Sequence, residues 1–132
     1  MTERFVTNIA RYLLGGVFLL FGLNFFFGFL PLDALERESA MKFMQGLHSS
    51  GYFMPFLKGV EIFMGLFLVL GFYVPLALVI LMPVTLNVFL FNLFLDPASL
   101  PLSIVLLVSH IYLAWVYRSH YAGLFKKTEW PK

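Results

Sequence analysis

The stretch from Met54 to Leu95, MPFLKGVEIFMGLFLVLGFYVPLALVILMPVTLNVFLFNLFL, decides the fold of this chain. It carries only two charged side chains, Lys58 and Glu61. One helical crossing of a bilayer needs about 20 apolar residues, so a stretch of this length predicts two crossings. Because a charge at the centre of a bilayer is costly, a carboxylate within such a segment indicates a functional site.

Glycine and proline residues divide the apolar sequence into four segments. Gly71 and Pro75 mark a tight turn inside the central stretch, and Asp96-Pro97 interrupts the chain before the last segment. Pro31 ends the first segment, because proline cannot continue the hydrogen-bond ladder of a helix. That segment is longer than the apolar core of a signal peptide and is expected to be a retained helix. Helices are therefore expected over residues 5–30, 55–73, 75–95 and 100–118.

Composition restricts the class of protein. The chain has 132 residues, which predicts a single integral membrane domain over residues 1–132. Only 12% of its residues are charged and 61% are hydrophobic, whereas soluble domains have about 25% charged residues. The net charge of +2 does not suggest a nucleic-acid partner. The sequence has no cysteine, which excludes thiol catalysis by this chain alone.

Residues 32–50 connect the first two segments and differ from them in character. Five apolar residues alternate there with five charged residues, which predicts a short amphipathic helix. Asp33 suits the N-cap position, and Gly46 lies near the expected end. Such a helix could lie on the membrane surface or fold over the mouth of the bundle. A solvated helix in a loop is an equal alternative.

The basic residues predict the orientation in the membrane. Six lysine and arginine residues flank the first and last segments, and three lie at the other end of the segments. Because cytoplasmic flanks carry the excess of basic residues, both termini are expected in the cytoplasm. The fold class is therefore all-α, a four-transmembrane-helix bundle with an amphipathic connector helix.

Most polar side chains of the four segments are predicted to lie in the half of the bundle remote from the termini, which we call the outer half. Lys58 and Glu61 are three residues apart on one helix face and can form an ion pair. Gly16, Asn24 and Gly28 follow a four-residue stride, which predicts a seam for a neighbouring helix. The candidates for binding a ligand or accepting a proton are Glu61, His110, Asn24, Asn87, Asn92, Lys58 and Ser103.

Each candidate also has a structural interpretation. The asparagines can form hydrogen bonds between helices, and His110 can be a histidine whose hydrogen bonds are satisfied within the bundle. Glu61 can be a structural partner of Lys58 rather than a functional group. The three histidines do not show the spacing of metal ligands, so no metal site is expected. No sequence motif of a soluble-type catalytic site is present.

The chain resembles the DoxX family of small four-helix bacterial membrane proteins. The resemblance rests on FGLNFFFGF at residues 21–29, SGYF at 50–53, Glu61 with Gly65 and Gly71, VPLA at 74–77, FNLFLDP at 91–97 and WVYR at 115–118. Two positions depart from the pattern of many relatives: Phe25 stands where they place a lysine, and Asn92 where they place a histidine. If that lysine pairs in those relatives with the acid at the position of Glu61, the charge of Glu61 in this chain must be compensated by Lys58, by Asn24 or by a proton.

The resemblance implies a role in a membrane redox system of the bacterial cytoplasmic membrane. The leading hypothesis is a subunit that binds a small lipophilic molecule, such as a quinone, in the outer half of the bundle. Such a subunit would need a redox partner protein, and self-association into a homo-oligomer is compatible with it. The alternatives are a structural or scaffolding membrane protein without a ligand and a small transporter or proton path. Whether the chain is itself an enzyme stays open at this point.

Overall fold

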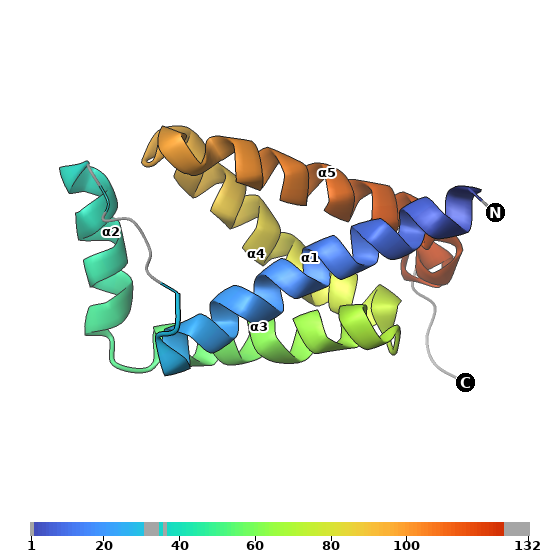
Figure 1. The fold of residues 1–132 in the computed structure, drawn as a ribbon, viewed down its shortest axis with the longest axis horizontal. Helices are drawn as coiled ribbons and strands as arrows, with labels where there is room; N and C mark the ends of the chain where they lie inside the picture. Colours follow the sequence, from blue (N-terminus) through green and yellow to red (C-terminus); the bar gives the residue numbers. More distant parts are fainter. Residues whose placement is uncertain (1, 31–34, 36, 126–132) are drawn as a thin grey trace.

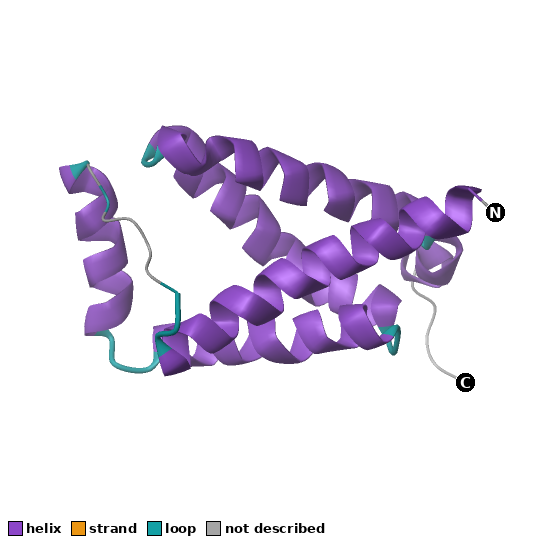
Figure 2. Cartoon of the chain, in the orientation of Figure 1, coloured by secondary structure: helices purple, strands orange, loops and turns teal. Residues whose placement is uncertain are grey.

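The structure is a computed structural model and describes residues 2–30, 35 and 37–125. Every regular element in these ranges is helical (Figure 2). The α-helices are α1 (Thr2–Phe27), α2 (Glu38–Ser49), α3 (Phe53–Leu70), α4 (Val74–Phe94) and α5 (Leu100–Val116). Two 3-10 helices, η1 (Pro97–Ser99) and η2 (Arg118–Phe125), precede and follow α5.

Four helical stretches are long and apolar enough to cross a membrane. They are α1, α3, α4 and the continuous stretch Pro97–Val116, which joins η1 to α5. The prediction of an all-α protein with four membrane-spanning helices is therefore confirmed. The chain is a multi-pass membrane protein, and the exposed apolar side chains of these helices suit contact with lipid.

Helices α1 and α3 pack closely because glycines let their backbones approach. A methyl group on Gly65 would lie 2.8 Å from the carbonyl oxygen of Gly15 and 2.9 Å from the backbone nitrogen of Leu19. A methyl group on Gly22 would lie 2.6 Å from Ile62. Small residues at such crossings are a general device of membrane helices, which have no hydrophobic driving force for association in lipid.

The glycine seam predicted on the first helix is wrong in its register. Cβ atoms added at Gly16 and Gly28 would meet no atom within 4 Å, whereas Gly15 and Gly22 face α3. Gly15 and Gly22 are seven residues apart, which returns to the same helix face after two turns. Asn24 is buried, but its hydrogen-bond partners lie just after it in the chain and not on a neighbouring helix.

The helices converge at one end of the molecule and diverge at the other (Figure 1). Helices α3 and α4 are joined by the short turn Gly71–Tyr73, in which Gly71 has a φ of 82° and Tyr73 a φ of 54°. From this turn α4 runs away from α3 towards the start of α5. The apolar core fills the converging half, and its fully buried members include Leu14, Leu68 and Leu78.

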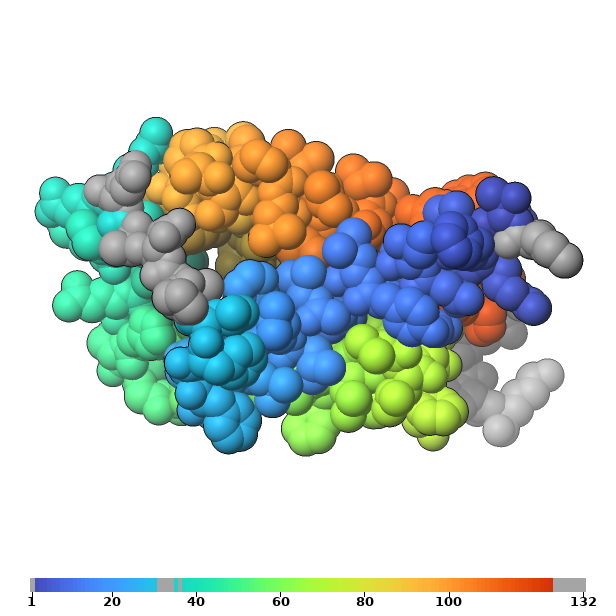
Figure 3. Space-filling view, in the orientation of Figure 1, coloured from blue at the N-terminus to red at the C-terminus, as the bar shows by residue number. Residues whose placement is uncertain are grey.

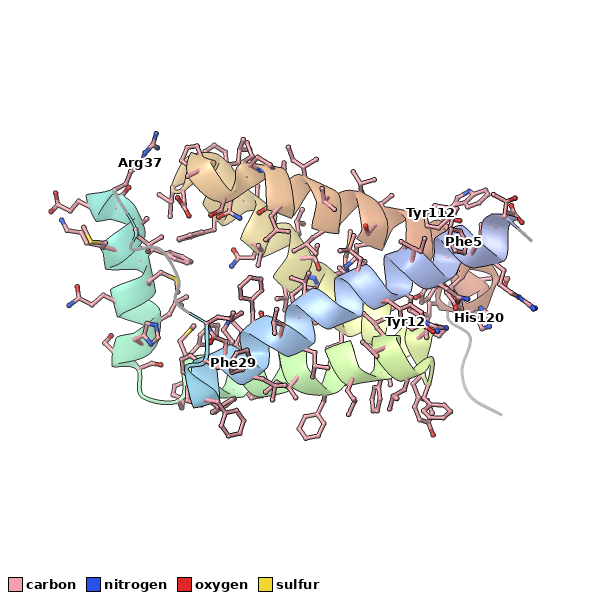
Figure 4. All side chains as sticks on the ribbon, viewed as in Figure 1. Phe5, Tyr12, Phe29, Arg37, Tyr112 and His120 are labelled. Carbon is pink, nitrogen blue, oxygen red and sulfur yellow. The ribbon has the colours of Figure 1, made fainter. Side chains whose placement is uncertain are left out.

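The connector helix α2 stands across the diverging end (Figure 1). It begins at Glu38, later than expected, and the predicted N-cap Asp33 lies outside the described residues. Arg37, just before α2, donates a hydrogen bond from Nη1 to the carbonyl oxygen of Phe94 at 3.1 Å, and Figure 4 shows its side chain reaching towards the end of α4. The expected position over the mouth of the bundle therefore describes α2 better than a free loop helix.

Gly65→Ala should lower the free energy of unfolding by about 1–3 kcal/mol, because backbone atoms of α1 cannot move aside for the methyl group. Gly59→Ala, on the same helix, is the matched control, since a Cβ there meets no atom within 4 Å. Thermal unfolding of the purified variants in mild detergent measures the difference. Equal melting temperatures for the two variants would contradict the close crossing of α1 and α3.

Candidate functional site

A cavity of about 530 Å³ lies between α2, α3 and α4 at the diverging end, and we call it the outer cavity. Figure 3 shows the molecule hollowed at this end, where α4 is visible behind α1 and α5. Most of the lining is apolar, and its polar members are Lys58, Glu61 and Asn87. The apolar lining residues are Phe43, Met44, Leu47, Phe53, Met54, Leu57, Pro83, Val84, Val88 and Phe91.

Lys58 and Glu61 form the ion pair that their spacing predicts. The Lys58 Nζ lies 3.0 Å from Oε2 of Glu61, and the two side chains are 20% and 4% exposed. At this distance the ammonium is also placed to donate a hydrogen bond to Oε2. Oε2 is buried and makes no hydrogen bond to any other described residue. The carboxylate is thus neutralised by Lys58, and because each of its oxygens accepts more than one hydrogen bond, part of its acceptor capacity is not used there.

Asn87 lies on α4, on the wall of the outer cavity that faces α3. Its side chain is exposed, and none of the hydrogen bonds found among the described residues involves it. A side-chain amide both donates and accepts hydrogen bonds. Of the seven predicted site residues, the structure therefore brings Lys58, Glu61 and Asn87 together around one cavity.

Asn24 has a different environment. Its Oδ1 accepts a hydrogen bond of 2.6 Å from the backbone N–H of Leu30, and its backbone carbonyl accepts one of 2.7 Å from Gly28. Gly28 has a φ of 63°, a left-handed conformation typical of the residue after a helix. Asn24 therefore stabilises the end of α1 and is not among the residues that line the outer cavity.

His110 is held at the interface of α4 and α5. Its Nε2 lies 2.8 Å from the carbonyl oxygen of Leu78, and its Nδ1 lies 2.9 Å from Oγ1 of Thr85. Because a carbonyl oxygen only accepts, Nε2 carries the proton and donates it. In the neutral ring, Nδ1 then accepts from the Thr85 hydroxyl. Both ring nitrogens have protein partners, as in the structural interpretation of this histidine.

The same interface contains a second polar pair nearer its outer end. The side-chain amide of Asn92 donates a hydrogen bond to the hydroxyl of Ser103, and that hydroxyl lies 3.4 Å from the carbonyl oxygen of Ser99. Asn92 and Ser103 are buried. Neither they nor His110 line the outer cavity, so the expected single cluster of polar groups is divided between the cavity, the α4–α5 interface and the end of α1.

The sequence did not indicate which apolar residues enclose the site. Phe43 of α2 and Phe91 of α4 pack with ring centroids 5.4 Å apart, and both line the outer cavity. Phe25 of α1 stacks on His48 of α2, with centroids 6.0 Å apart. The apolar face of the predicted connector helix was the only signal for these contacts, because a pattern shows a face without showing its partner.

A second cavity of about 460 Å³ lies between α4, α5 and η2 at the opposite end of the bundle. Apart from His110 and Tyr121, its lining is apolar. The Tyr121 hydroxyl donates a hydrogen bond of 2.8 Å to the carbonyl oxygen of Pro75. Burial and, to a lesser degree, the nearby Tyr117 raise the pKa of the Tyr121 phenol, so this hydroxyl remains protonated as a donor. Its role is to hold η2 against the start of α4.

Among the described residues, no group of three His, Cys, Asp or Glu side chains could hold a metal ion. The family model of DoxX matches residues 6–93. This chain belongs to the DoxX family. In this DoxX-family chain, every residue that lines the outer cavity falls within the matched range, whereas Ser103 and His110 lie beyond it. No curated protein and no solved structure matches the chain.

His110→Ala should lower the free energy of unfolding by about 1–3 kcal/mol, because it leaves the Thr85 hydroxyl without its buried partner and opens a void. Val108→Ala is the matched control on the same helix, since Val108 is 61% exposed. Thermal unfolding in detergent measures both variants. A loss for His110→Ala no larger than the loss for Val108→Ala would show that the histidine bonds do not hold α4 against α5.

Proposed function

We propose that this DoxX-family protein binds a small lipophilic molecule, of the quinone class, in the outer cavity as the membrane subunit of a redox system. The observation that carries the proposal is the cavity itself, about 530 Å³ of mostly apolar space with an almost completely buried carboxylate on its wall. This volume lies in the range of about 300–1,000 Å³ that is usual for small-molecule sites. A purely structural bundle would gain stability by filling such a space.

The assignment of roles follows the geometry of the cavity. Glu61 and Lys58 provide the charged groups, and Asn87 provides an amide on the facing wall. A ligand of the quinone class exchanges electrons with a second redox group, which we assign to a partner protein. The sequence has no cysteine and therefore provides no thiol pair for this role. His110, Asn92 and Ser103 would support the site indirectly, by holding α4 against α5.

Scaffolding without a ligand is the second candidate function. It is favoured by the hydrogen bonds of Asn24, Asn92 and His110, all of which have partners within the chain. The two functions differ in what they require of the outer cavity. A scaffold tolerates a filled cavity, whereas a binding protein loses its activity when the cavity is filled.

Val88→Trp should abolish binding of a short-chain quinone, because Val88 lines the outer cavity and the indole would occupy it. Leu86→Trp is the matched control on α4, since Leu86 is 44% exposed and does not line the cavity. Quinone-induced thermal shifts of the purified proteins measure binding, and mass spectrometry of the untreated protein identifies what co-purifies. An absence of both a co-purified quinone and a thermal shift in the unmodified protein would favour the scaffold.

We also propose that the protein lies in the bacterial cytoplasmic membrane with α2 outside and both termini in the cytoplasm. The beginning of α1 and the end of α5 lie at one end of the bundle, and α2 lies at the other (Figure 1). The excess of basic residues near the termini supports the cytoplasmic assignment of that end.

A membrane-impermeant maleimide should label Ser39→Cys in intact cells and should leave Ser119→Cys unlabelled until the cells are opened. Ser39 is an exposed residue of α2, and Ser119 is an exposed residue of η2. No native residue competes for the maleimide, because the sequence has no cysteine. The reverse pattern of labelling would invert the topology. Equal labelling would place both positions on the same side and contradict the three crossings, α3, α4 and α5, that separate them.

A further inference from the structure

The charges at the outer cavity cancel each other. The Lys58 ammonium lies 3.0 Å from the Glu61 carboxylate, and no other charged side chain lines the cavity among the described residues. Bringing a charged ligand into this apolar space would require its desolvation without an unpaired opposite charge to compensate. The cavity therefore favours a ligand that carries no charge.

The hydrogen-bonding groups at the outer cavity are not all satisfied by one another. Apart from Lys58, Glu61 has no hydrogen-bond partner among the described residues, although its side chain is only 4% exposed. Because Oε2 is fully buried beside Lys58, a ligand in the cavity would reach the other carboxylate oxygen, Oε1. An ionised carboxylate accepts hydrogen bonds and cannot donate them. A ligand with a hydroxyl group can donate to it, whereas a carbonyl oxygen placed there would bring two acceptors together.

The α4 wall of the cavity is suited to a second polar group of the ligand. The amide of Asn87 can donate to or accept from a second oxygen. The remaining lining, which includes Phe43, Leu57 and Phe91, is apolar and suits an aromatic or alkyl body. The cavity thus offers polar groups from α3 and α4, at Glu61 and Asn87, within a mostly apolar lining.

We infer that the ligand of the outer cavity is a neutral molecule with a hydroxyl donor, of the phenol or hydroquinone class, whose hydroxyl group donates to Glu61. This inference rests on the proposed function and narrows it to the hydroxyl-bearing, reduced form. The quinone, which has only acceptor oxygens, binds more weakly at this site.

Three probes of the same shape test the inference: trimethylhydroquinone, trimethylbenzoquinone and the dimethyl ether of the hydroquinone. Binding to the purified full chain in detergent is measured under anaerobic conditions by calorimetry. A hydrogen bond to a charged acceptor predicts that the hydroquinone binds at least about tenfold more tightly than the other two probes. Equal binding of the three overturns the hydroxyl inference and leaves the proposed function intact, whereas no binding of any probe overturns both.

Charged probes test the requirement for neutrality. A decanoate ion and a decylammonium ion are both expected to bind more weakly than the hydroquinone. If the anion binds more tightly than the hydroquinone, Lys58 is free to bind a ligand. If the cation binds more tightly than the hydroquinone, Glu61 is free to bind a ligand. Either result overturns the inference of a neutral ligand.

Glu61→Gln tests the residue itself. The amide of glutamine donates as well as accepts, so the preference for the hydroquinone over the quinone should fall to within about threefold. Glu38→Gln is the matched control, since Glu38 pairs with Lys42 on the exposed face of α2 and lies outside the cavity. A preference unchanged in Glu61→Gln overturns the assignment to Glu61. Glu61→Gln leaves Lys58 without its charged partner. If the single variant does not fold for this reason, the double variant Lys58→Met with Glu61→Gln is tested instead.

Discussion

The structure depends on the close crossing of α1 and α3 at Gly15, Gly22 and Gly65. In lipid there is no hydrophobic force to bring two apolar helices together, so packing at backbone distance supplies the attraction. This crossing makes α1 and α3 the most closely associated pair of helices in the bundle. The other helices are then arranged around that pair.

The outer cavity follows from this arrangement. The turn Gly71–Tyr73 holds the start of α4 against the end of α3, and hydrogen bonds to His110 hold α4 to α5 rather than to α3. Helix α4 therefore leaves α3 as it runs towards the outer end (Figure 1). The space between them is covered by α2, which is linked to α4 through Arg37 and Phe43. A cavity results where the two pairs of helices separate.

The polar residues serve two different purposes in this bundle. Thr85, Asn92, Ser103 and His110 are buried and bonded to one another or to backbone across the α4–α5 interface, where they hold two helices together. Glu61 is buried as well, yet its one polar contact among the described residues is with Lys58 of its own helix, so it joins no two helices together. That difference, rather than burial or charge alone, distinguishes the proposed site from structural polar contacts.

The sequence by itself determined the number of crossings, the short turn near Gly71, the amphipathic character of the connector and the pairing of Lys58 with Glu61. Each of these depends on residues that are close in the chain, through hydrophobic run length, turn residues or helical spacing. The tertiary structure alone decided that Gly15 rather than Gly16 faces α3, and that Asn87 shares a cavity with Glu61 while His110 does not. Helical phase shows which residues share a face but not which neighbour that face meets, because the neighbour is set by how all the helices pack together.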